Sequence, residues 1–64
     1  MRYAIRFRFP DMEGISYAGD YKGTLGFAPS LDTAIIWTER ETAERILKNG
    51  YGALAAYAEV IEVA

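Results

Sequence analysis

The sequence contains no cysteine and no histidine. Without cysteine it can form no disulfide, thiolate nucleophile or cysteine-ligated zinc site, and without histidine it lacks the commonest general base and metal ligand. No apolar run approaches the roughly 18–20 residues of a membrane span. The N-terminal residues alternate charged and apolar groups, unlike a secretory signal. We therefore expect a cytoplasmic protein with no cofactor, no metal site and no membrane partner.

The composition that remains is typical of a folded chain. Apolar residues make up 52% of the 64 residues and aromatic residues 14%, which separates the chain from disordered sequences. Its length sets a limit of one small domain, residues 1–64, which buries only about 60% of its unfolded surface. Seven basic and nine acidic residues give a net charge of −2, which provides no overall attraction to nucleic acid.

The N-terminal segment alternates in hydropathy with a period of two, which predicts a half-buried strand over residues 3–9. One face would hold Tyr3, Ile5, Phe7 and Phe9, and the other Arg2, Ala4, Arg6 and Arg8. Pro10 would end the strand, because proline cannot donate to a ladder, and residues 11–14 would form a turn. Shorter strands are expected at 15–18, paired with the first strand, and at 24–27, after a glycine-rich turn.

A helix over residues 39–48 has the strongest signal in the chain. Thr38 and Glu41 have the spacing of a capping box, in which each side chain accepts a hydrogen bond from the other residue's backbone N–H. Glu41–Arg45 and Glu44–Lys48 are expected i, i+4 ion pairs, and Asn49-Gly50 would stop the helix. The apolar run at 34–37 predicts a strand leading into it.

The C-terminal segment leaves several structures open. Residues 51–58 are compatible with helix, loop or strand; we favour a loop followed by a strand near 56–63, central in the sheet because both of its faces carry apolar groups. The predicted fold is α+β, with a three- to four-stranded, mainly antiparallel sheet packed by a single α-helix in ββ(β)αβ order. The expected core is Ile5, Phe7, Trp37, Ala43, Ile46, Leu47 and Val60, with some of Tyr3, Phe9 and Ile61.

One stretch of the chain shows a family resemblance. Ala34, Trp37, Thr38 and Ala43, with the closing residues 60–63, form a pattern similar to that of small phage and prophage proteins of unknown function. In those proteins a short strand with an alanine and an aromatic residue precedes a threonine-capped helix, and a valine-rich strand ends the chain. The resemblance covers the last half of the chain and implies an origin in a mobile element. It implies no catalytic residue.

The remaining polar residues indicate structure rather than catalysis. Glu39, Glu41 and Glu44 would lie on a capped, solvated helix face, although paired carboxylates can act as acid and base in a desolvated cleft. Asp11, Glu13 and Asp20 lack calcium-loop spacing, and the glycines lack a phosphate-binding pattern. We therefore do not expect an enzyme.

Surface aromatics favour a binding role. Four tyrosines exceed what so small a core can bury, and tyrosine and arginine are enriched at interface hot spots. The sequence predicts a non-enzymatic protein-interaction module, a homodimer or a protein docked on another, that binds through Tyr17, Tyr21, Tyr51, Tyr57, Arg6 and Arg8 or by pairing at a sheet edge. The alternative is a small nucleic-acid-binding protein that uses the Arg2, Arg6 and Arg8 face.

Overall fold

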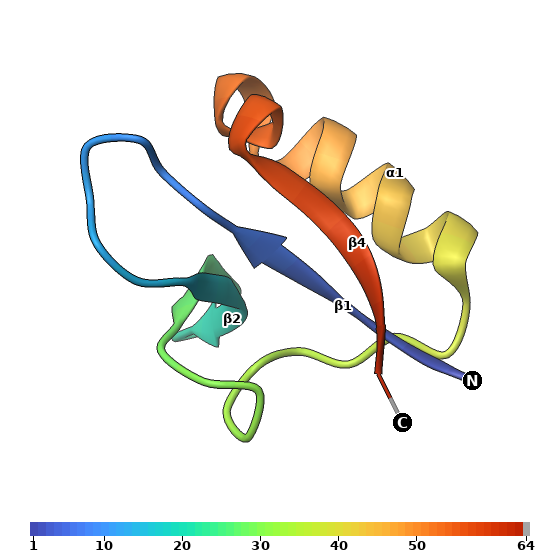
Figure 1. Ribbon diagram of the computed structural model, residues 1–64. Helices are drawn as coiled ribbons and strands as arrows, with labels where there is room; N and C mark the ends of the chain where they lie inside the picture. The colour runs from blue at the N-terminus through green and yellow to red at the C-terminus, as the bar shows by residue number, and fades with distance from the viewer. Residues whose placement is uncertain (64) are drawn as a thin grey trace.

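The alternating N-terminal segment forms the first of four strands, as its period predicts. The computed structural model describes residues 1–63 and contains β1 (Arg2–Phe7), β2 (Ser16–Tyr21), β3 (Thr24–Ala28), α1 (Arg40–Gly50), a short 3₁₀ helix η1 (Gly52–Tyr57) and β4 (Ala58–Val63) (Figure 1). The strands form one antiparallel sheet in the order β3-β2-β1-β4. The predicted α+β class, with one main helix on the sheet, is confirmed.

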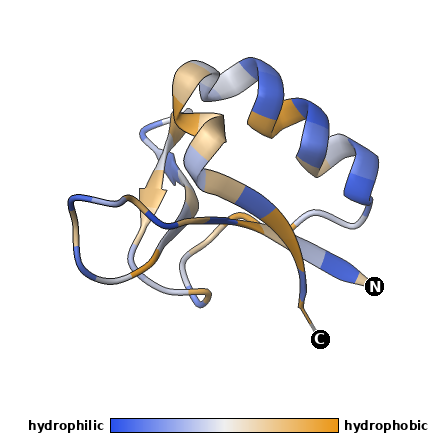
Figure 2. Ribbon diagram, turned by 45° about the horizontal axis from the view of Figure 1, so that its top comes forward, coloured by the Kyte–Doolittle hydropathy of each residue, from blue (hydrophilic) through white to orange (hydrophobic). Residues whose placement is uncertain are grey.

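The core lies between α1 and the β1–β4 half of the sheet. Ile5, Phe7 and Ala43 are fully buried. The remaining predicted core side chains pack against them; they are Tyr3, Phe9, Trp37, Ile46, Leu47 and Val60. Polar residues lie on the outward side of the helix, as its hydropathy colouring shows (Figure 2). The i, i+3, i+4 spacing of Ala43, Ile46 and Leu47 therefore set the inward face of α1.

The position of β4 corrects one prediction. β4 lies at an edge of the sheet, next to β1, and not at its centre. Its two apolar faces have different coverings: Val60 packs with the core beneath α1, whereas Val63 lines a cavity shared with the loop residues Leu31 and Ile36. Helix and loop cover the two faces of this edge strand, so its apolar pattern resembles that of a central strand.

Residues 34–37 do not form the predicted strand. β1 and β2 pair only at Arg6–Tyr17 and Phe7–Ser16. Beyond these two pairs, residues 34–37 cross from β2 to β1. The Ile35 N–H donates to the Ala18 carbonyl at 2.9 Å, and Trp37 exchanges two 2.8 Å hydrogen bonds with Tyr3. Each end of the segment therefore makes a single bridge, to β2 and to β1 respectively.

The predicted capping box does not form. The helix begins at Arg40, and the N-cap is Glu39, whose backbone is extended and whose side chain makes no capping hydrogen bond. The backbone N–H and C=O of Trp37 are both hydrogen-bonded to Tyr3. The chain therefore leaves the sheet too late for Thr38 to serve as the N-cap of the helix. The ion pair on the helix is Arg40–Glu44, at 3.6 Å, in place of the two expected pairs within the described residues.

The two segments left open by the sequence have defined structures. β2 and β3 are joined by a two-residue turn in which Lys22 and Gly23 both have positive φ, 51° and 86°. Such a turn suits the right-handed twist of a hairpin but strains a residue with a Cβ atom. After α1, residues 52–57 form the 3₁₀ helix, so β4 starts at Ala58 rather than near residue 56.

Candidate interaction surface

The helix covers only half of the sheet. α1 packs on β1 and β4, and the β2–β3 hairpin lies to the side of it (Figure 1). In β3 the side chains of Leu25 and Phe27 point to the same face as the core, because side chains two apart share a face of a strand. Leu25 lies against Gly50 at the end of α1 and is 38% exposed, whereas Phe27 lies beyond the helix and is 49% exposed. The uncovered half of the sheet therefore presents apolar side chains to solvent.

Aromatic rings connect this exposed region to the core. Phe7, which is fully buried, has its ring centroid 4.8 Å from that of Tyr51 and 5.1 Å from that of Phe27. Phe9 continues the cluster, 6.0 Å from Phe27 and 5.7 Å from Tyr57. Such offset and edge-on contacts stabilise aromatic pairs beyond their buried area. The exposed rings are therefore held by a rigid core rather than by a loop alone.

An apolar cavity of about 440 Å³ adjoins these rings. It is lined by Phe9, Met12, Ser16, Phe27 and Leu54. Met12 is 65% exposed at its rim, although such a side chain is normally removed from water. We call the set Phe9, Met12, Leu25, Phe27 and Leu54 the apolar face. It combines side chains from β3, from the loop after β1 and from η1.

Tyr51 connects the helix end to the hairpin. Its hydroxyl donates to the Gly26 carbonyl at 2.7 Å, and its ring is buried in the core. Burial raises the pKa of the Tyr51 hydroxyl above its ordinary value, and a hydrogen bond with the Gly19 backbone acts in the opposite direction. Gly19 and Gly26 are partners across β2 and β3, so the hydroxyl lies beside that pair.

The four predicted interface tyrosines do not form one surface. Tyr51 belongs to the core, which corrects its expected place at the surface, because the aromatic cluster and the Gly26 carbonyl satisfy both its ring and its hydroxyl. Tyr21 is 64% exposed at the hairpin end, with the Lys22 ammonium 5.6 Å from its ring centroid. Tyr17 is half-buried, and Tyr57 is exposed beside Phe9.

The predicted arginine face is partly neutralised. Arg6 forms an ion pair with Glu59 of the adjacent β4. Arg6, the exposed Arg8 and Tyr57 line a shallow cavity of about 270 Å³ together with Glu59, so a carboxylate faces the same space. Three of the six predicted contact residues thus line this cavity, and a fourth, Tyr17, is the partner of Arg6 across β1 and β2. A carboxylate in that position opposes the binding of a polyanion.

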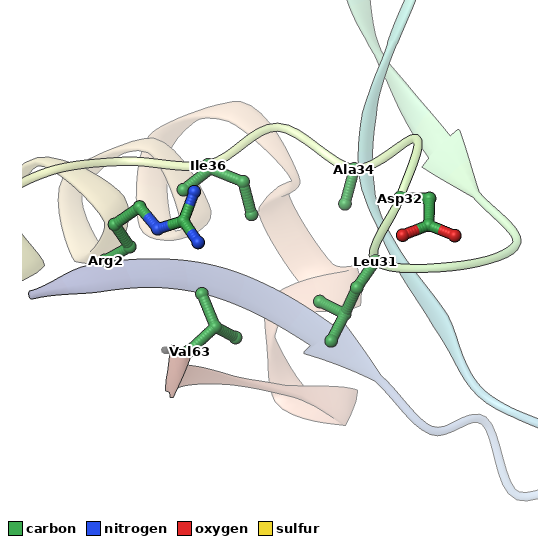
Figure 3. Close-up of a pocket in the computed structure, with 6 residues that line it drawn as sticks. All are labelled: Arg2, Leu31, Asp32, Ala34, Ile36 and Val63. Carbon is green, nitrogen blue, oxygen red and sulfur yellow. The ribbon is translucent and has the colours of Figure 1, made fainter.

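A further cavity of about 410 Å³ lies on the sheet face opposite the helix. Its lining includes Arg2 of β1, Val63 of β4 and Asp32 of the loop, with Arg2 and Asp32 at opposite ends (Figure 3). Among residues 1–63, no three metal-ligating side chains come together to hold an ion. None of the helices in this part of the chain is long and apolar enough to cross a membrane.

Sequence reasoning missed most of the apolar face. Phe9 was assigned to the core, and Met12, Leu25, Phe27 and Leu54 were given no role. One signal was available: residues 24–28 contain no charge, whereas the C-terminal strand carries Glu59 and Glu62. An uncharged strand must lie inside a sheet, or form an edge that can accept a partner.

Comparisons with protein-family models, with curated proteins and with solved structures found no match to this chain. The resemblance to small phage and prophage proteins therefore stays a prediction.

Proposed function

We propose that this protein is a non-enzymatic protein-interaction module that binds through the apolar face. The observation that supports this proposal is the uncovered half of the sheet, where Phe27, Met12 and Leu54 are exposed around one apolar cavity. Contiguous exposed apolar side chains mark binding surfaces in small soluble domains. Aromatic anchors surrounded by smaller apolar groups are also typical of interface hot spots.

The chain offers a matched pair of variants for a test. Met12 lies in the apolar face, whereas Met1 is 80% exposed outside it. We expect Met12→Ser to weaken association measured by light scattering over increasing protein concentration, and Met1→Ser, made in a chain whose N-terminal tag supplies the initiating methionine, to leave it unchanged. Concentrations should reach about 1 mM, because small interfaces bind weakly.

Association with a different protein is tested by the same pair. The chain is immobilised, a lysate of its source is passed over it, and the bound proteins are compared between Met12→Ser and Met1→Ser. A strictly monomeric mass, together with no bound protein that depends on Met12, refutes the proposal.

The nucleic-acid alternative has less support. Arg6 is paired with Glu59, and Arg8 lies beside the same carboxylate. Binding to phosphates weakens steeply as salt is added. Flat titrations with single-stranded DNA and RNA at low salt would end this alternative, and salt-dependent binding lost in the double variant Arg6→Ala, Arg8→Ala would support it.

A further inference from the structure

The backbone of β3 carries unused hydrogen-bonding groups along the open edge of the sheet. β3 is the terminal strand, and its partner on the inner side is β2. The Ala18 carbonyl points away from β3, because it accepts the hydrogen bond of Ile35. Ala18 faces Phe27, and in an antiparallel pair of this kind both residues direct their backbone groups away from each other. The N–H and C=O of Phe27, and by alternation those of Leu25, therefore point outward.

We propose, building on the proposed function, that the partner of this edge is a second copy of the chain, paired β3 to β3 about a two-fold axis through Gly26. In this antiparallel arrangement Leu25 of one copy faces Phe27 of the other, twice. Each such pair exchanges two hydrogen bonds, so the dimer uses all the outward N–H and C=O groups of both residues. The edge is complementary to itself, as a two-fold interface requires.

Side chains and charges agree with this arrangement. Residues 24–28 contain no charged residue, so two copies approach without repulsion at the strand. Leu25 and Phe27 lie on one face and would form cross-strand apolar pairs, which stabilise sheets. The axis also brings the turn with Lys22, before one β3, toward the turn with Asp32, after the other. These two residues have opposite charge.

The opposite edge explains why β3 and not β4 forms the contact. β4 carries Glu59 and Glu62. Glu59 and Glu62 lie on opposite faces of β4, so in a two-fold antiparallel pairing centred on either residue that glutamate would face its own copy, and like charges directly opposite each other destabilise a strand pair. Charged residues on an edge strand are a common protection against such pairing. A second copy is therefore directed to β3.

Disulfide trapping tests the register, because the chain has no cysteine of its own. Leu25→Cys with an affinity tag and untagged Phe27→Cys are mixed and oxidised mildly. We expect the mixed disulfide to exceed both homodisulfides well beyond the statistical proportion. The matched control on the other edge, Glu59→Cys mixed with Ile61→Cys, which lie two apart on one face of β4, should give the statistical proportion. A statistical mixture from the β3 pair would overturn the proposal.

A proline scan tests the backbone hydrogen bonds. Leu25→Ala and Leu25→Pro both remove the side chain, but only proline removes the outward N–H, which the β2–β3 ladder does not use. With both variants folded by circular dichroism, we expect the proline variant to dimerise at least tenfold more weakly than the alanine variant. Equal dimerisation would refute edge pairing. Association that depends on Met12 but not on these β3 variants would refute this dimer and retain the interaction module.

Discussion

The two halves of the sheet are built from similar residues but end in different environments. In the β1–β4 half, α1 covers the aromatic face, and the outer strand carries Glu59 and Glu62. In the β2–β3 half only the end of α1 reaches the sheet, where Gly50 lies against Leu25, and the outer strand is uncharged and exposes Phe27. The β1–β4 half therefore has the features of an ordinary domain surface, and the β2–β3 half has those of an interface.

This difference indicates how a very short chain divides its apolar residues. One helix of 11 residues cannot cover four strands. The apolar side chains that α1 leaves exposed lower the stability of the monomer, whose small core supplies only about 3–5 kcal/mol. Association with a partner can bury these side chains without a longer chain. The association stays limited to one contact if only one of the two sheet edges accepts a partner.

The largest expected effect separates the two halves within one aromatic cluster. Phe7→Ala removes a fully buried ring and should cost about 3–5 kcal/mol, enough to unfold most of the protein. Phe27→Ala removes a ring that is half exposed and should cost roughly 1–2 kcal/mol in the monomer. Urea denaturation at low protein concentration measures both. Equal losses would contradict the division into a covered and an open half.

A smaller effect concerns the hydrogen bond that joins the halves. Tyr51→Phe removes the bond from its hydroxyl to the Gly26 carbonyl and should cost about 1 kcal/mol near neutral pH. In the folded chain the pKa of Tyr51 is raised above its ordinary value of 10.0. The contribution of the Tyr51 hydroxyl to the free energy of unfolding is therefore complete below pH 10. Above that pH the unfolded chain loses the proton first, and the contribution falls as pH rises.

The pH dependence can be measured as a difference between two proteins. The free energies of unfolding of the wild type and of Tyr51→Phe should converge as the pH is raised beyond 10, the ordinary pKa of the hydroxyl. A difference that stays constant across this range would show that burial of the hydroxyl does not shift its ionisation.

The turn of the open half should be easy to improve. Lys22 has a φ of 51°, which asparagine adopts at lower cost than lysine, and Asn-Gly is the preferred pair for such a turn. We expect Lys22→Asn to stabilise the fold by about 0.5–1 kcal/mol. Lys48→Asn, which removes the same charge from the helix, serves as the control and should give no gain in thermal unfolding.

The smallest effect is expected at the ion pair of the covered half. Arg6 and Glu59 are both solvent-accessible, so Glu59→Gln should cost less than about 1 kcal/mol. The loss should shrink as salt is added, because exposed charges are screened. Glu62→Gln removes a carboxylate from the same strand and is the control. A loss that is independent of salt would mean that the pair is more buried than its exposure indicates.

Much of the fold was predictable because several elements have a strong local pattern. The alternation of Tyr3, Ile5 and Phe7 with smaller or charged residues identified β1, and the apolar spacing in 43–47 identified α1. The predicted capping box does not form, although Thr38 and Glu41 have the residue types and spacing that it requires. A bridge between Trp37 and Tyr3, far apart in sequence, set where the helix could begin.

The candidate site was less predictable for the same reason. The sequence supplied surplus aromatic residues, and a binding role followed from that surplus. Which of them are exposed depends on where a single helix comes to rest: it buries Tyr51 and leaves Phe27 open, although both are aromatic residues in weakly patterned segments.

The sequence by itself determined the main elements β1 and α1, the mainly antiparallel α+β class and the inward faces of these elements, because these follow from the periodicity of neighbouring residues. Only the tertiary structure decided that β4 and β3 are the edges and that the β2–β3 half is uncovered. Burial is a property of which faces meet, and faces distant along the chain meet only after the chain has folded.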